Sequence, residues 1–192
     1  MFTAPARRSR SSGPLPARPL APPPILSPTQ PAKEYSMESI EQIMRHDHER
    51  LDVLLEAGAK AVHEGLWHEA ADLLQRFRHG LVHAHMVVEE TLLFPAFETQ
   101  QGHAGLALTA ILRKGHQDLR VFFLEMAEAI AARDDEEFAA LLRTVRALLK
   151  QHDSKEESEL YPQVAAAMPE QGRAVGKLLL SLQRATADPS AR

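Results

Sequence analysis

The phrase His-x3-Glu-Glu-x3-Leu-aromatic-Pro occurs twice in the chain without a gap, and it limits the possible folds more than any other feature. One copy begins at His85 and the other at His152. A single histidine precedes each copy at nearly the same distance: His48 lies 37 positions before His85, and His116 lies 36 positions before His152. The chain therefore consists of two similar halves, each with one histidine followed by a His-x3-Glu pair.

From Met37 onward, apolar residues recur at the spacing of an amphipathic α-helix. The pattern predicts four long helices, over about residues 37–62, 67–97 and 106–132 and from the candidate cap Asp134 through Leu160, with Pro169 and Gly172 as interruptions before a short fifth helix over about 173–185. The predicted inward stripes are mostly leucine, valine and phenylalanine. They also contain polar residues: His48, His85, His116, His152 and Glu156.

The predicted fold class is all-α. No segment alternates with the period of two that a strand requires, and the predicted connections are short. Long amphipathic helices joined by short turns favour an up-down-up-down four-helix bundle. Each half of the repeat would form a helical hairpin, and the two hairpins would pack about a pseudo-two-fold axis. We place this bundle at residues 37–185.

The residues on either side of the bundle have a different composition. Residues 1–36 are rich in proline and arginine, and the prolines prevent a regular amphipathic helix. This stretch lacks the apolar middle of a secretory signal. It is predicted to be a disordered extension, with an organelle transit peptide and a start at Met37 as the alternatives. Residues 186–192 are predicted to be a frayed tail.

The repeated phrase predicts a metal site. On a helix, residues four apart project from the same face, so the histidine and the first glutamate of each phrase point the same way. Buried carboxylates are costly unless they are paired or bind cations. Imidazole and carboxylate groups suit iron, manganese and zinc, and a glutamate has two oxygens with which to bridge two ions. The predicted ligands of this two-metal site are His48, His85, Glu89, His116, His152 and Glu156.

The amino-acid composition limits the kinds of metal site and of catalysis that the chain can support. The chain has ten histidines and no cysteine, which excludes disulfides, thiolate catalysis and iron–sulfur clusters, so any metal must be held by nitrogen and oxygen. A net charge of −4 gives no argument for nucleic acid or a membrane surface as a partner. No apolar run approaches the ~18 residues of a membrane span. We expect a cytoplasmic protein, and the sequence leaves its oligomeric state open.

The other chemistry-bearing residues have structural interpretations. Glu90 and Glu157 are expected on a solvated face, with the edge of the metal site as the alternative. Phe94 and Tyr161 are expected to shape the core, and the prolines after them to bend or end the helices. Tyr161 is also a candidate hydrogen-bond donor near the metals. Six histidines are expected to be solvent-facing or structural: His46, His63, His68, His79, His83 and His103.

The repeated phrase resembles the signature of the hemerythrin/HHE cation-binding family, over residues 38–168. The resemblance implies a hemerythrin-like four-helix bundle with a non-haem, carboxylate-bridged di-iron centre. The six residues above would then be the ligands of two iron ions, bridged by Glu89 and Glu156, with manganese or zinc as alternatives. A ferritin-like site would use Glu-x-x-His pairs, and no glutamate in this chain has a histidine three positions later.

One departure from the family pattern bears on function. Oxygen-carrying hemerythrins have a His-x3-His pair on the third helix, whereas the positions four before and four after His116 are Leu112 and Arg120. The chain is therefore more similar to HHE members linked to iron-centre repair, to nitric oxide or peroxide responses, and to sensing. The repair proteins commonly have an added cysteine-containing domain, and this chain has no cysteine.

These observations predict a di-iron protein that binds or reacts with a small molecule such as O2, NO or peroxide. One alternative is an enzyme that turns over peroxide or delivers iron for iron–sulfur cluster repair, although the sequence shows no separate acid–base pair or nucleophile. Another is a regulatory module in which metal occupancy sets the stability of the bundle.

Overall fold

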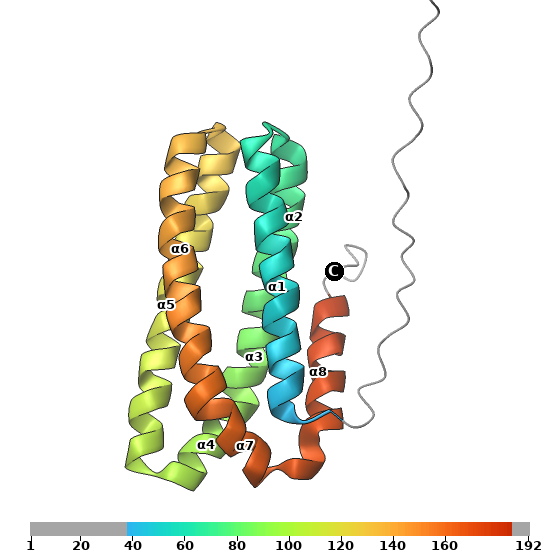
Figure 1. The fold of residues 1–192 in the computed structure, drawn as a ribbon, viewed down its shortest axis with the longest axis vertical. Coiled ribbons are helices and arrows are strands. Elements are labelled where there is room, and N and C mark those ends of the chain that lie inside the picture. The colour runs from blue at the N-terminus through green and yellow to red at the C-terminus, as the bar shows by residue number, and fades with distance from the viewer. Residues whose placement is uncertain (1–37, 186–192) are drawn as a thin grey trace, which may run out of the picture. The chain divides into compact units, whose positions relative to one another are not determined.

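The computed structural model describes residues 38–185, and every regular element in that range is a helix. The predicted disordered extension (1–36) and the predicted frayed tail (186–192) lie outside the described residues. Four long helical segments run antiparallel to one another, and a shorter helix packs beside them (Figure 1). The predicted up-down-up-down four-helix bundle with a short fifth helix is confirmed.

The first long segment is α1 (Ile40–His63). The second comprises α2 (Trp67–Gly80), the π-helical turn η1 (Leu81–His85), α3 (Met86–Val88), the π-helical turn η2 (Glu89–Leu93) and α4 (Phe94–Gln101). The third is α5 (His103–Ala132), and the fourth comprises α6 (Asp135–Lys155), the π-helical turn η3 (Glu156–Leu160) and α7 (Tyr161–Ala167). The 3-10 turn η4 (Pro169–Gln171) leads into α8 (Gly172–Arg184).

Local sequence sets several helix ends. Ser39 and Gln42 form a capping box at the start of α1: Ser39 Oγ accepts from the backbone N–H of Gln42 at 3.2 Å, and Gln42 Oε1 accepts from that of Ser39 at 2.9 Å. The predicted cap of the fourth segment is confirmed, because Asp134 Oδ1 accepts from the backbone N–H of Glu137 at 2.9 Å. Gly65, at φ 72°, turns the chain between α1 and α2 in a conformation that costs glycine little.

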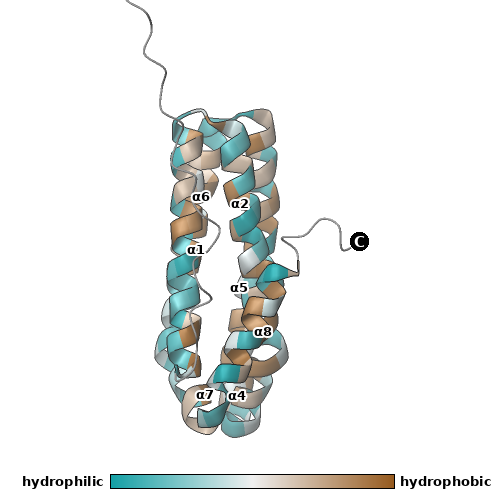
Figure 2. Ribbon diagram, turned by 90° about the vertical axis from the view of Figure 1, so that its right-hand side faces the viewer, coloured by the Kyte–Doolittle hydropathy of each residue, from teal (hydrophilic) through white to brown (hydrophobic). Residues whose placement is uncertain are grey.

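Buried apolar side chains form two clusters, and a polar layer separates them. Along α5, His116 lies between Leu112 of one cluster and Leu119 of the other, and His48 has the same place along α1. Hydrophobic and hydrophilic residues occupy different faces of the same helices (Figure 2). The polar layer is therefore enclosed by apolar packing from both ends of the bundle.

The short helix α8 covers the side of the bundle next to this layer. It buries Val175 and Leu179, and it lies near α1, η1 and α3. Its Gln183 donates to Asp47 Oδ1 on α1 at 2.8 Å. No helix within residues 38–185 has an apolar stretch long enough to cross a membrane.

Candidate metal centre

The six side chains predicted as metal ligands lie together in the polar layer. All four long segments contribute to the group, and none of these side chains is more than 9% exposed. The donors are His48 from α1, His85 from η1, Glu89 from η2, His116 from α5, His152 from α6 and Glu156 from η3.

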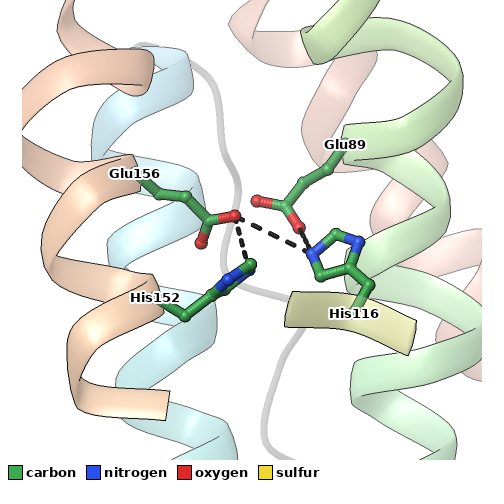
Figure 3. A group of neighbouring side chains, drawn as sticks. All are labelled: Glu89, His116, His152 and Glu156. Atoms are coloured by element: carbon green, nitrogen blue, oxygen red, sulfur yellow. Dashed lines mark ion pairs between the residues drawn. The ribbon is translucent and has the colours of Figure 1, made fainter. Parts of the chain in front are cut away.

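One half of the cluster consists of Glu89, His116, His152 and Glu156, whose ligand atoms lie within 4.8 Å of one another. His152 Nε2 is 2.8 Å from Glu156 Oε1. His116 Nε2 is 3.3 Å from Glu89 Oε2 and 3.9 Å from Glu156 Oε1. The two carboxylates point toward one another, with the two imidazoles facing them (Figure 3). A cation at this point would have two nitrogen and two oxygen donors.

The other half is built around His48 and His85, whose Nε2 atoms are 3.0 Å apart. His48 Nε2 is 3.5 Å from Glu156 Oε2, and His85 Nε2 is 3.5 Å from Glu89 Oε1. Each glutamate thus directs one oxygen to each half of the cluster. In this arrangement two carboxylates are able to bridge two ions.

Several polar atoms of the cluster have no hydrogen-bond partner. Four of the seven such buried side-chain atoms in residues 38–185 belong to it: Glu89 Oε2, His116 Nε2, His152 Nε2 and Glu156 Oε1. These atoms lie close together but are not aligned for hydrogen bonds with one another. A buried polar atom without a partner costs about 1–3 kcal/mol. A cation that contacts all four would remove this cost, so the residues present fit a metal ion.

For two of the imidazoles, a glutamate carboxylate lies against Nδ1, on the side of the ring away from the candidate ions. His48 Nδ1 is 3.0 Å from Glu157 Oε1, and His116 Nδ1 is 2.7 Å from Glu90 Oε1. The prediction that Glu90 and Glu157 lie on a solvated face is wrong: they are 30% and 29% exposed, and their carboxylates face the imidazoles. Each reaches the histidine of a neighbouring helix, which spacing along one helix does not show. Such partners keep the proton on Nδ1 and leave Nε2 free for a metal.

Asp47 is a buried residue of the site that the sequence pattern did not single out. Its Oδ2 accepts from His85 Nδ1 at 2.9 Å, and its Oδ1 accepts from Arg50 at 2.7 Å and from Gln183 at 2.8 Å. The side chain is held by three donors, and the residue is only 4% exposed. A signal was present, because Asp47 stands three positions after the core residue Met44 and so falls on the inward stripe of α1.

His152 has a different support. The residue before His116 is Gly115, where the residue before His48 is Asp47. The imidazole of His152 lies directly on this glycine, since a Cβ at Gly115 would be 2.8 Å from His152 Nδ1. Among the described residues, no hydrogen bond holds that nitrogen. Packing against backbone therefore replaces a carboxylate in this half.

The aromatic residue of the repeated phrase also differs between the halves. Tyr161 is fully buried, and its hydroxyl donates to Glu89 Oε1 at 2.5 Å. Its counterpart Phe94 stacks on His116, with ring centroids 5.6 Å apart and an interplanar angle of 21°. One half of the cluster thus has a phenol beside it, and the other has an apolar ring.

The π-helical turns place the glutamates. The backbone N–H of Phe94 donates to the carbonyl of Glu89, and that of Tyr161 donates to the carbonyl of Glu156, so each bond spans five residues. A proline follows each aromatic residue. Proline has no N–H and clashes with the carbonyl four residues back in an α-helix, and a wider turn relieves this conflict. Such turns are frequent at functional sites.

When protons rather than cations are bound to the imidazoles, the positive charges of the imidazoles compensate the negative charges of the carboxylates. Burial alone would lower the pKa of His85, but the charge of Glu89 and the hydrogen bond to Asp47 raise it to about 9. Burial also opposes the rise at His116, but the nearby carboxylates of Glu89 and Glu90 bring its pKa to about 9. In turn, these histidines outweigh burial and hold the pKa of Glu89 well below its usual range. Cations and protons would therefore compete for the same nitrogens.

The other six histidines lie outside the cluster. His46 is 40% exposed, and His79 and His83 stack on each other with ring centroids 5.1 Å apart. Three more are exposed near helix ends: His63, His68 and His103.

Comparison with curated proteins and with solved structures found no match. A family model described as the hemerythrin HHE cation binding domain matches residues 39–164. The matched range contains both copies of the repeated phrase and all six residues of the cluster. The chain therefore belongs to the hemerythrin HHE cation-binding domain family.

Proposed function

We propose that this chain is a cytoplasmic, non-haem di-iron protein that binds or reacts with a small molecule such as O2, NO or peroxide. His48 and His85 would hold one ion, and His116 and His152 would hold the other. Both glutamates of the cluster would bridge the two. The iron pair, when bound, supplies open coordination positions and electrons for the small molecule.

One observation carries this proposal. Four buried atoms of Glu89, His116, His152 and Glu156 converge on a common region without hydrogen bonds, and the second oxygen of each glutamate faces the other pair of histidines. An arrangement of this kind is costly unless positive charge occupies both halves. The two-fold repeat accounts for two equivalent places rather than one.

The surrounding residues define what the site would admit. Leu112 and Leu119 flank the polar layer along α5, and the apolar clusters to which they belong close the bundle above and below. Such enclosure limits water and favours small, weakly polar ligands. The protein provides four donors in each half, fewer than octahedral coordination requires, so an added ligand has a place to bind.

The test is reconstitution of the metal-free protein with ferrous iron under anaerobic conditions, followed by elemental analysis. We expect two iron ions per chain, and parallel loading with manganese or zinc shows whether the site prefers iron. The double variant His85→Ala/His152→Ala removes one nitrogen from each half and should retain no stoichiometric iron. The matched control is His63→Ala/His103→Ala, which removes two exposed histidines and should load like the parent.

The loaded protein is then mixed with O2, NO or hydrogen peroxide, and its absorbance is followed. A change with one of these molecules that the double variant does not show identifies the ligand. Turnover of peroxide by the loaded but not by the metal-free protein would favour the enzyme instead. Absence of iron uptake by the parent chain would end the proposal.

A further inference from the structure

The hydroxyl of Tyr161 lies against the pair formed by His48 and His85, although packing of the ring in the core does not require this contact. Its Oη atom is 3.3 Å from the Nε2 atoms of both histidines, 2.5 Å from Glu89 Oε1 and 3.2 Å from Glu156 Oε2. The residue is 0% exposed. The phenol oxygen is thus surrounded by four atoms, each of which has been assigned to the same candidate ion.

A hydrogen bond alone does not account for this position. A phenol has one O–H and donates to one acceptor at a time. The contact with Glu89 uses that proton, and the same oxygen is also within 3.3 Å of His48 Nε2 and His85 Nε2 and 3.2 Å from Glu156 Oε2, which is more contacts than its single proton can make. The Nδ1 atoms of both histidines already face carboxylates, at 3.0 Å for Glu157 and at 2.9 Å for Asp47, so their Nε2 atoms point inward, toward the phenol oxygen.

The distances match those between neighbouring ligands of one metal ion. Two donors at right angles, each about 2.1 Å from an ion, lie about 3.0 Å apart. Seven of the ten separations within this group of five atoms are 2.5–3.5 Å. Asp153 is a weaker candidate for a further ligand, because its Oδ1 is 3.8 Å from His48 Nε2.

We propose that Tyr161 Oη is a fifth protein ligand of the ion held by His48 and His85. The inference rests on the proposed two-metal function. On binding, the Oη–H bond breaks as the Oη–metal bond forms, and the proton passes to solvent. The counterpart Phe94 offers no donor, so the position at His116 and His152 keeps four protein ligands and is the one that takes the small molecule.

The test uses the full chain, loaded with ferrous iron and oxidised with ferricyanide. A phenolate bound to ferric iron absorbs visible light by charge transfer. We expect such a band in the parent protein and its loss in Tyr161→Phe, with two iron ions retained per chain. The matched control is Tyr35→Phe, which removes the chain's other tyrosine and should keep the band.

Resonance Raman spectroscopy supplies a readout that does not depend on the folding of a Tyr161 variant. Excitation within the band of the Tyr35→Phe protein should enhance phenolate ring vibrations, and Tyr161 is then the only tyrosine that can give them. Two bound irons without phenolate signals would overturn the inference and leave the two-metal site standing. Failure of the parent chain to bind iron would overturn both.

Discussion

The metal-free bundle should lose stability as the pH rises from 6.5 to 9.5. His85 and His116 are buried against Glu89, and their pKa values lie at about 9, above the ordinary value of 6.5. A group whose pKa is higher in the folded than in the unfolded chain stabilises the fold while it is protonated. The contribution is complete below pH 6.5 and is lost as the pH rises through 9.

The size of the effect follows from the shifts. A rise from 6.5 to about 9 corresponds to about 3 kcal/mol for each histidine. Because His85 and His116 share Glu89, the two contributions are not additive, and we expect a total loss of about 3–6 kcal/mol. For a domain of this size, 1 kcal/mol moves the Tm by about 2–4 °C, so the Tm should fall by at least about 6 °C.

Calorimetry of chelator-treated protein at several pH values measures this dependence. His85→Gln should flatten the slope, whereas His63→Gln, at an exposed position, should leave it unchanged. The metal-loaded protein should show a widening Tm advantage over the metal-free form as the pH rises, because cations displace these protons and bind more tightly in base. A metal-free Tm that stays constant or rises between pH 6.5 and 9.5 would refute the reasoning.

Two further predictions separate the halves of the site. Asp47→Asn should weaken the binding of one of the two ions by about 10–100-fold, the usual contribution of a carboxylate behind a ligating histidine. Titration against a competing chelator measures this, and equal affinities before and after the change would contradict it. Gly115→Ala should affect the other ion, because the new Cβ would displace the His152 imidazole. Elemental analysis after dialysis against a chelator should then find one ion per chain, and two retained ions would speak against this packing role.

The fold was predictable because the helical signal is local. Apolar spacing and the caps place each long segment to within a few residues, but the helix ends differ where no core contact marks them. The second segment continues past Phe97 to Gln101, and α5 begins at His103 rather than at Leu106. Between these two helices, Gly102 has a φ of 58°, and the apolar pattern does not mark this position. The apolar periodicity indicates which residues face the core, and the residues in the last turn of a helix need not face it.

The cluster itself was predictable because its members share one face of each helix. The carboxylates behind the imidazoles were not, since they depend on the register between helices. Glu90 and Glu157 each lie beside an inward glutamate and extend to another helix. The apolar spacing places Asp47 on the inward face of α1, but it does not show that the partner of Asp47 is His85 of the neighbouring segment. Spacing within a helix contains no information on which neighbouring helix a side chain reaches.

The repeat predicts two similar halves of the site, but the residues that surround the two halves differ. Asp47 stands where the other half has Gly115, and Tyr161 stands where the other half has Phe94. The two polar members come from opposite halves of the sequence, yet the bundle brings both to the same pair of histidines. Equal sets of histidines and glutamates therefore lie in unequal surroundings. We expect two ions of different affinity, with the less supported one as the place where a small molecule binds.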